Sequence, residues 1–107
     1  MTTVELQLPE PIARLVPKVG EKVLLQALRD SLARLISEEK QELAQVRDRI
    51  RHYESKYKAD FASFEKQMPA HGDYRLHEDY GEWSYLQERA DSIIMDISEY
   101  EQVYGSI

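Results

Sequence analysis

Apolar and polar residues alternate over residues 3–8 of the chain. Val4, Leu6 and Leu8 would lie on one side of an extended backbone, with polar residues between them. This period of two predicts a short strand with one buried side, which Pro9 ends because proline cannot donate to a strand ladder. A single strand is not stable in water, so we expect it to pair with the same strand of a second chain.

The next segments show the spacing of helices. Pro11 can open a short helix that extends to Pro17, and Gly20 supplies a break. From Glu21 to about Lys58 there is no glycine or proline, and apolar residues recur at spacings of three and four, which predicts one long helix. These positions are Leu25, Leu28, Leu32 and Leu35, followed by Leu43, Val46, Ile50, Tyr53 and Tyr57.

The length of this helix predicts association with other helices. It would span on the order of 57 Å at ~1.5 Å per residue, which exceeds the width of a compact domain of this size. Its apolar face shifts register near Glu39, and such long periodic helices usually pair as coiled coils or bundles. We therefore predict a homodimer. Its expected interface residues are Val4, Leu6, Leu8, Leu25, Leu28 and Leu32.

The pattern breaks after Lys58 and resumes near the C-terminus. Asp60 can cap a short helix that carries Phe61 and Phe64, and Pro69 and Gly72 mark the following loop. A last helix begins between residues 73 and 76, and its apolar positions alternate at spacings of three and four. They are Trp83, Leu86, Ala90, Ile93, Ile97, Tyr100 and Tyr104. This helix can fold back on the long helix as an antiparallel hairpin.

These elements predict a mainly α-helical, dimeric protein. Residues 1–20 would form an N-terminal strand and short helix, residues 21–58 the long helix, and residues 59–107 the short Phe-bearing helix with the return helix. A charged content of 32% suits helices with a narrow apolar stripe. No apolar run approaches the ~18 residues of a membrane span, and the N-terminus lacks the features of a signal peptide. With no cysteine in the chain, these features favour a cytoplasmic protein without disulfides.

Charge divides the chain into two unlike parts. Residues 1–58 hold 11 Lys/Arg against 9 Asp/Glu, a net charge of +2, whereas residues 59–107 hold 3 against 11, a net charge of −8. Such asymmetry indicates surfaces with different partners, although an acidic bias can also serve only to solvate a helix.

The candidates for chemistry are weak. His71, His77 and the acids that follow lie close together in the sequence, but His77 and Glu82 are not spaced as a pair on one helix face. No His-Glu-x-x-His motif is present. Acids at the start of a helix are instead favoured by its dipole. No serine stands in a glycine elbow and no glycine-rich phosphate loop occurs. We therefore predict no metal site, no cofactor and no catalytic residue.

Aromatic residues and the N-terminal pattern suggest binding. All ten aromatic side chains lie between Tyr53 and Tyr104, and most of them fit the hairpin core, which leaves Tyr74 and Tyr85 for a partner. The order of strand, short helix, break and helix resembles ribbon–helix–helix dimers, whose strands enter the DNA major groove. DNA is a weak alternative here because Glu5 repels phosphate and the strand carries no Lys or Arg.

A short motif resembles that of a family of small prokaryotic proteins. The stretch KYKADFASFE is similar to Lys-Tyr-Gly-x-Ser/Thr-Phe-x-x-Phe-Glu, and Asp79, Tyr80, Glu82 and Trp83 match a following Asp-Tyr-x-Glu-Trp. Those proteins look like antitoxins of two-gene toxin–antitoxin operons. In this chain Lys58 replaces the glycine, so we expect the long helix not to end in a left-handed residue there. Asp60 replaces the Ser/Thr and keeps its capping chemistry.

The resemblance implies a non-enzymatic antitoxin that sequesters a small basic, RNA-cleaving toxin and regulates its own operon. An acidic helical module suits a basic partner, and the residues expected to contact it are Glu78, Asp79, Glu82 and Tyr85. A structural coiled-coil adaptor with no nucleic-acid role is the alternative, and an unrecognised enzyme is a third reading.

Overall fold

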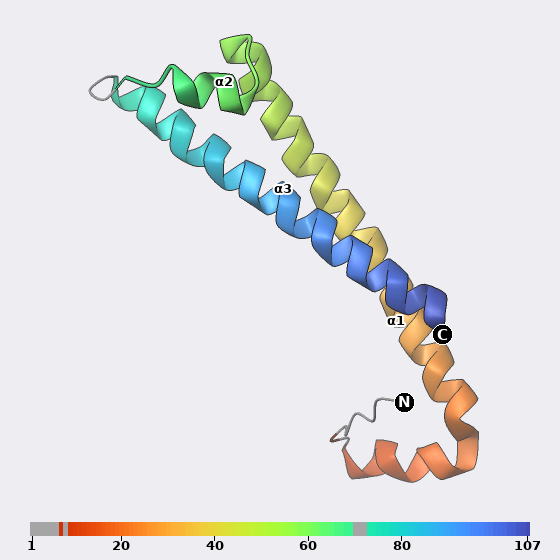
Figure 1. Ribbon diagram of the computed structural model, residues 1–107. Coiled ribbons are helices and arrows are strands. Elements are labelled where there is room, and N and C mark those ends of the chain that lie inside the picture. Colours follow the sequence, from red (N-terminus) through yellow and green to blue (C-terminus); the bar gives the residue numbers. More distant parts are fainter. Residues whose placement is uncertain (1–6, 8, 70–72) are drawn as a thin grey trace.

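The chain folds as an extended helical hairpin with a bent N-terminal segment (Figure 1). This architecture comes from a computed structural model, which describes residue 7, residues 9–69 and residues 73–107. The molecule measures 65 × 25 × 22 Å and its radius of gyration is 21.2 Å. A compact domain of about 100 residues would have a radius of gyration of about 13 Å. Much of the chain therefore lies far from any common centre.

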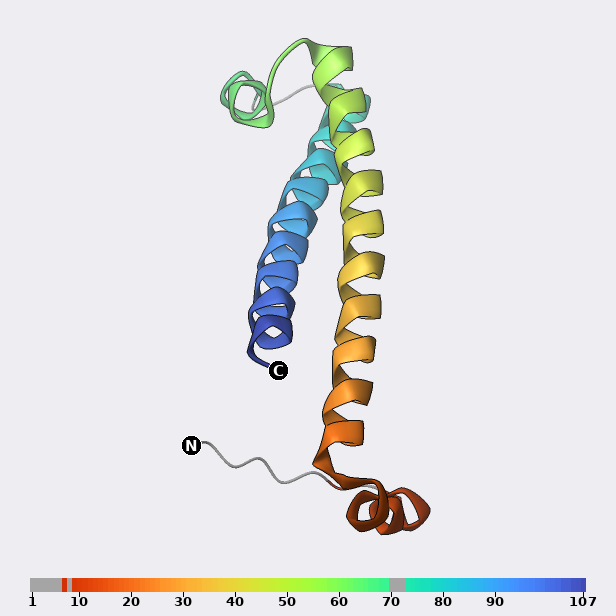
Figure 2. The ribbon, with the colours of Figure 1, turned by 90° about the vertical axis from the view of Figure 1, so that its right-hand side faces the viewer.

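Helix α1, Glu10–Tyr57, contains one sharp bend. Gly20 has φ 80° and ψ 169°, a backbone conformation that residues with a Cβ rarely adopt. The bend at Gly20 separates a short N-terminal segment of α1 from a long straight one. Figure 2 shows the short segment nearly end-on, crossing the end of the long one. Pro11 stands in the first turn, where its missing N–H costs no hydrogen bond. The helix continues through Glu39 without a break.

The predicted N-terminal strand falls largely outside the described part of the chain. Val4, Leu6 and Leu8 lie outside the described residues, and no strand occurs among those that are described. The mainly helical character and the antiparallel hairpin of the two long helices are confirmed.

The end of α1 differs from the prediction. Lys58 adopts the left-handed conformation, with φ 53° and ψ 42°, and its N–H donates to the Glu54 carbonyl. The expectation that a lysine at this position would prevent a left-handed ending was wrong. This conformation costs a residue with a Cβ about 1–2 kcal/mol. The cost is offset because the left-handed residue ends the helix with a hydrogen bond to a carbonyl that would otherwise lack a partner, and because it begins the reversal of the chain.

Replacing Lys58 by glycine should therefore stabilise the protein. We expect the free energy of unfolding to rise by about 1 kcal/mol, because glycine adopts the left-handed conformation without steric cost. Urea denaturation followed by circular dichroism measures this change. Gln45→Gly, at an exposed position inside α1, is the matched control and should destabilise by about 0.5–1 kcal/mol. A destabilised Lys58→Gly protein would contradict the argument.

Two capped helices complete the reversal. Helix α2, Phe61–Lys66, begins after Asp60, whose side chain accepts a hydrogen bond of 2.8 Å from the Ser63 N–H, as predicted for a capping residue. Helix α3, Tyr74–Ser106, follows Asp73, which caps it by accepting from the Arg75 N–H at 2.9 Å. It returns beside α1 as far as Leu25, which lines one groove together with Ile107.

The core lies at the closed end of the hairpin. Trp83 and Ile93 are completely buried, and the aromatic rings of α1 and α2 surround Trp83. The other buried residues are Leu43, Val46, Tyr53, Phe64, Leu86 and Ala90. The predicted packing of Trp83, Ile93 and Ile97 on Val46, Ile50 and Tyr53 is borne out, because all six belong to or pack against this one cluster. The N-terminal part of α1 is less buried, since the buried residues of this helix begin at Leu43.

Candidate protein-binding surfaces

The acidic start of α3 lies against the end of α1 rather than facing solvent as a whole. Asp79 accepts hydrogen bonds from Lys56, at 2.6 Å, and from the Tyr57 hydroxyl. Its side chain is 17% exposed. Burial acts to raise the pKa of Asp79, but the hydrogen bonds from Lys56 and Tyr57 outweigh it and lower the pKa below its ordinary value of 3.8. The Asp79 carboxylate therefore has a structural role, because its hydrogen bonds to Lys56 and Tyr57 link α3 to α1.

Glu82 is also engaged within the hairpin. Its carboxylate forms an ion pair with Arg49 of α1. Farther along, Arg89 donates two hydrogen bonds, of 2.9 and 2.8 Å, to Glu42. Such cross-helix pairs fix the register of α3 against α1, although exposed pairs of this kind add little stability.

Glu78 and Tyr85 remain on the surface. Tyr85 is 60% exposed, and Glu78 is exposed without an ion pair among the described residues. Together with Glu82 they recur at spacings of four and three, so they share one face of α3. Of the four residues predicted to contact a partner, these two are free to do so, and Asp79 and Glu82 are already held by α1. These two pairings could not be predicted from local sequence patterns, because each partner lies more than 20 residues away.

A second surface is apolar and lies along the N-terminal third of the molecule. Leu25 and Leu28 are 45% and 43% exposed, and Leu32 is half-buried. Leu35, 41% exposed, continues this face at a spacing of three from Leu32. The other exposed apolar residues of α1 lie elsewhere: Ile12, Leu15 and Val19 precede the bend at Gly20, and Val23 is nine residues from Leu32, on the opposite side of the helix. The C-terminal part of α3 runs beside this stripe but leaves it partly uncovered, and extended exposed apolar surfaces commonly mark interaction sites. We name Leu25, Leu28, Leu32 and Leu35 the apolar stripe.

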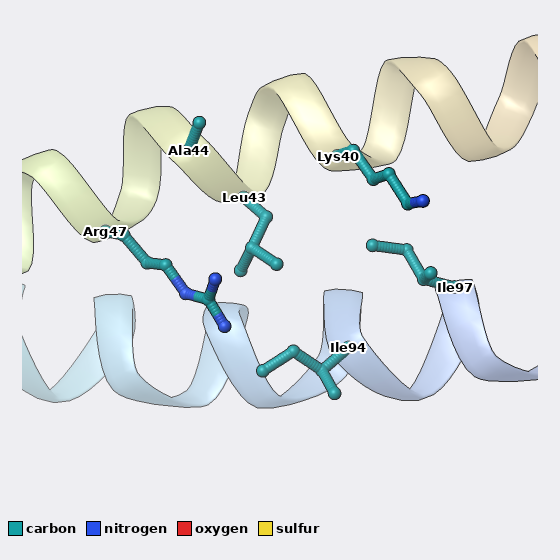
Figure 3. Close-up of a pocket in the computed structure, with 6 residues that line it drawn as sticks. All are labelled: Lys40, Leu43, Ala44, Arg47, Ile94 and Ile97. Carbon is teal, nitrogen blue, oxygen red and sulfur yellow. The ribbon is translucent and has the colours of Figure 1, made fainter.

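A third feature is a notch in one side of the hairpin, shown in Figure 3. Its volume is about 360 Å³. Leu43 and Ala44 of α1, with Ile94 and Ile97 of α3, give it an apolar lining, and Lys40 and Arg47 stand at its two ends. No pattern in the sequence indicates this site, because it forms only where the two helices lie side by side.

The described residues contain no cluster of metal-ligating side chains and no helix suited to crossing a membrane. Nowhere in residues 9–69 and 73–107 do three His, Asp or Glu side chains gather as a metal site would require, and His71 lies outside these ranges. Within the same ranges, no helix combines the length and apolar character that crossing a bilayer demands.

In comparisons with known proteins, no family model, no curated protein and no solved structure matches the chain.

Proposed function

We propose that this protein acts by binding, as an antitoxin-like homodimer that sequesters a small basic protein. The observation that carries the proposal is the partly uncovered apolar stripe of α1, in a hairpin whose core is complete only at its closed end. A free-standing monomer gains nothing from keeping this stripe in water, whereas a second copy that covers it removes large apolar side chains from solvent. The expected dimer contacts are therefore Leu25, Leu28 and Leu32, together with the N-terminal segment.

The character of the sequestered partner follows from charge. Residues 59–107 carry a net charge of −8, and Glu78 and Tyr85 present an acid and an aromatic ring on one exposed face of α3. Complementary charge accelerates encounter with a basic protein, and tyrosine supplies contact area at such interfaces. The resemblance of the stretch KYKADFASFE to a motif of antitoxin-like proteins favours a toxin, such as one that cleaves RNA, as this basic partner.

The test is co-expression with the product of an adjacent gene. We expect the neighbour to arrest growth when it is expressed alone, and to be captured as a complex when both proteins are produced. Association should slow as ionic strength rises toward physiological values, because exposed charges are screened over ~8 Å at 0.15 M salt. A harmless neighbour and an empty capture would reject the antitoxin reading and favour the coiled-coil adaptor, which the 65 Å length also suits.

Glu78→Lys should slow formation of this complex without unfolding the hairpin. Because Glu78 is exposed, reversing its charge should change the association rate constant by about three- to tenfold at low salt and leave the thermal melt unchanged. Stopped-flow or surface-based binding measures the rate. The matched control is Glu38→Lys, an exposed position on α1 near the level of Glu101 and therefore far along the hairpin from Glu78 and Tyr85. Equal effects of both variants would show only a general charge effect.

A further inference from the structure

The four α1 residues that line the notch have a defined helical spacing. Lys40, Leu43, Ala44 and Arg47 stand at i, i+3, i+4 and i+7. Figure 3 shows them along the upper helix, with Ile94 and Ile97 on the helix below. In coiled coils, a hole is formed by four residues of one helix at this spacing, and it receives one side chain, the knob, from a facing helix. The notch therefore has the form of a hole without its knob.

The same arrangement occurs a second time on the same side of α1. A groove nearer the N-terminus is lined by Lys22, Leu25, Gln26 and Arg29, again at i, i+3, i+4 and i+7. Each member precedes its counterpart in the notch by 18 residues, which is five turns at 3.6 residues per turn, so both grooves lie on one side of the helix. Two places on one side of α1 therefore have the residue spacing of a coiled-coil hole.

The two helices carry opposite charge along this side. On α1, the positions from Lys22 to Arg51 that continue the notch spacing include no acid. They are Lys22, Gln26, Arg29, Ala33, Ile36, Lys40, Ala44, Arg47 and Arg51, here called the basic edge. On α3 the positions at spacings of three and four around Ile94 include no base. They are Gln87, Asp91, Ile94, Ser98 and Glu101, here called the acidic edge.

We propose that a second copy of this chain covers this side, with its acidic edge on the basic edge of the first, to form a four-helix bundle. A two-fold axis parallel to the helices places α3 of each copy across from α1 of the other. Ala44 and Ile94 line the same notch and so lie at the same level. The rotation therefore brings Ile94 of the second copy over the hole around Ala44, and the reciprocal contact forms at the same time.

The charges that flank this contact are complementary. Asp91 is one turn before Ile94, and Arg47 is one turn after Ala44. Because the helices are antiparallel, both steps lead toward the closed end of the hairpin. Arg47 of one copy thus meets Asp91 of the other. Both side chains are exposed, and neither takes part in an ion pair within the described chain. Lys40 pairs with Glu101 of its own chain at 3.2 Å.

Charge selects this arrangement over the other two-fold packing. An axis across the helices would place the basic edge of α1 on itself, and juxtaposed like charges oppose association. The available face is large enough, since a molecule of 65 × 25 Å exceeds the ~800 Å² per partner of a standard interface.

The bundle leaves the proposed toxin-binding face open. Ile94 follows Tyr85 by nine residues, or two and a half turns, and therefore points away from the face of Glu78 and Tyr85. This inference rests on the homodimer of the proposed function and specifies how its copies pack.

Charge reversal with complementation tests the packing. Arg47→Asp and Asp91→Arg should each weaken dimerisation at least about tenfold in sedimentation equilibrium, because each places like charges in contact twice per dimer. An equimolar mixture of the two variants should recover a heterodimer within about threefold of the wild-type Kd, since both contacts then join opposite charges. A tag on one variant identifies the heterodimer by capture of the other. Arg34→Asp and Glu88→Arg, exposed positions off these edges, are the matched controls and should dimerise as the wild type does.

A neutral variant tests the hole itself. Ala44→Leu fills the hole at an exposed position, so the hairpin should melt as before while the dimer weakens at least about tenfold. The four-helix bundle is wrong if both single charge variants dimerise with wild-type affinity, or if their mixture stays monomeric. The dimer would then form through other residues. If the wild-type protein is monomeric at high micromolar concentration, both the proposed homodimer and this packing are wrong. The proposal that the chain binds a toxin would then depend only on the capture experiment.

Discussion

Replacing Trp83 by alanine should lower the free energy of unfolding by about 3–5 kcal/mol, the range for large aromatic residues removed from a core. The indole is 0% exposed. Its ring centroid lies 5.0 Å from that of Phe64, 5.4 Å from that of Phe61 and 5.7 Å from that of Tyr53, so all three helices lose their common contact at once. Urea denaturation at one fixed protein concentration measures the loss, since association also contributes to apparent stability.

Two variants separate ring packing from other effects. Tyr85→Ala, two residues along α3 and 60% exposed, should change stability by no more than about 0.5 kcal/mol. Trp83→Phe should lose much less than Trp83→Ala. It keeps an aromatic ring and removes the indole N–H, which has no hydrogen-bond partner among the described residues. A loss below about 1 kcal/mol for Trp83→Ala would place the ring outside the core.

Periodicity was sufficient to predict the hairpin. Residues from Trp83 to Ile97 recur at spacings of three and four, and the same spacing runs from Leu43 to Tyr57, so each helix has one apolar face and the two faces cover each other. The aromatic residues of α2 could be assigned to the same core because Asp60 marks where that helix begins.

Other features depend on contacts that a local pattern does not contain. From the sequence alone, the acids at the start of α3 are expected to be solvated and available to a partner. Asp79 is nevertheless held by Lys56, and Glu82 by Arg49, through a chain reversal whose geometry the sequence does not specify. Lys58 took a conformation that residue preference assigns to glycine, because closing the hairpin outweighs the local cost. The notch likewise requires both helices in register.

Leu32→Asp should convert the proposed dimer into monomers. Leu32 lies in the middle of the apolar stripe, where Leu28 and Leu35 are exposed on the same helix. A carboxylate there would have to be buried without a partner in each copy when the stripe is covered, at a cost of several kcal/mol. A loss of about 3 kcal/mol corresponds to a rise in Kd of roughly 100-fold. Light scattering coupled to size exclusion, at high micromolar concentration, should then report one chain instead of two.

The variant must remain folded for this result to concern association. Leu32 lies outside the buried cluster at the closed end, so the fluorescence of Trp83, the one tryptophan of the chain, should report an intact core. Ser37→Asp, five residues along α1 and exposed, introduces the same charge away from the stripe and should leave the dimer unchanged. A Leu32→Asp protein that stays dimeric with native fluorescence would show that the apolar stripe does not lie in the interface. The copies would then meet through the notch, where the Arg47–Asp91 contact rather than the apolar stripe governs their association.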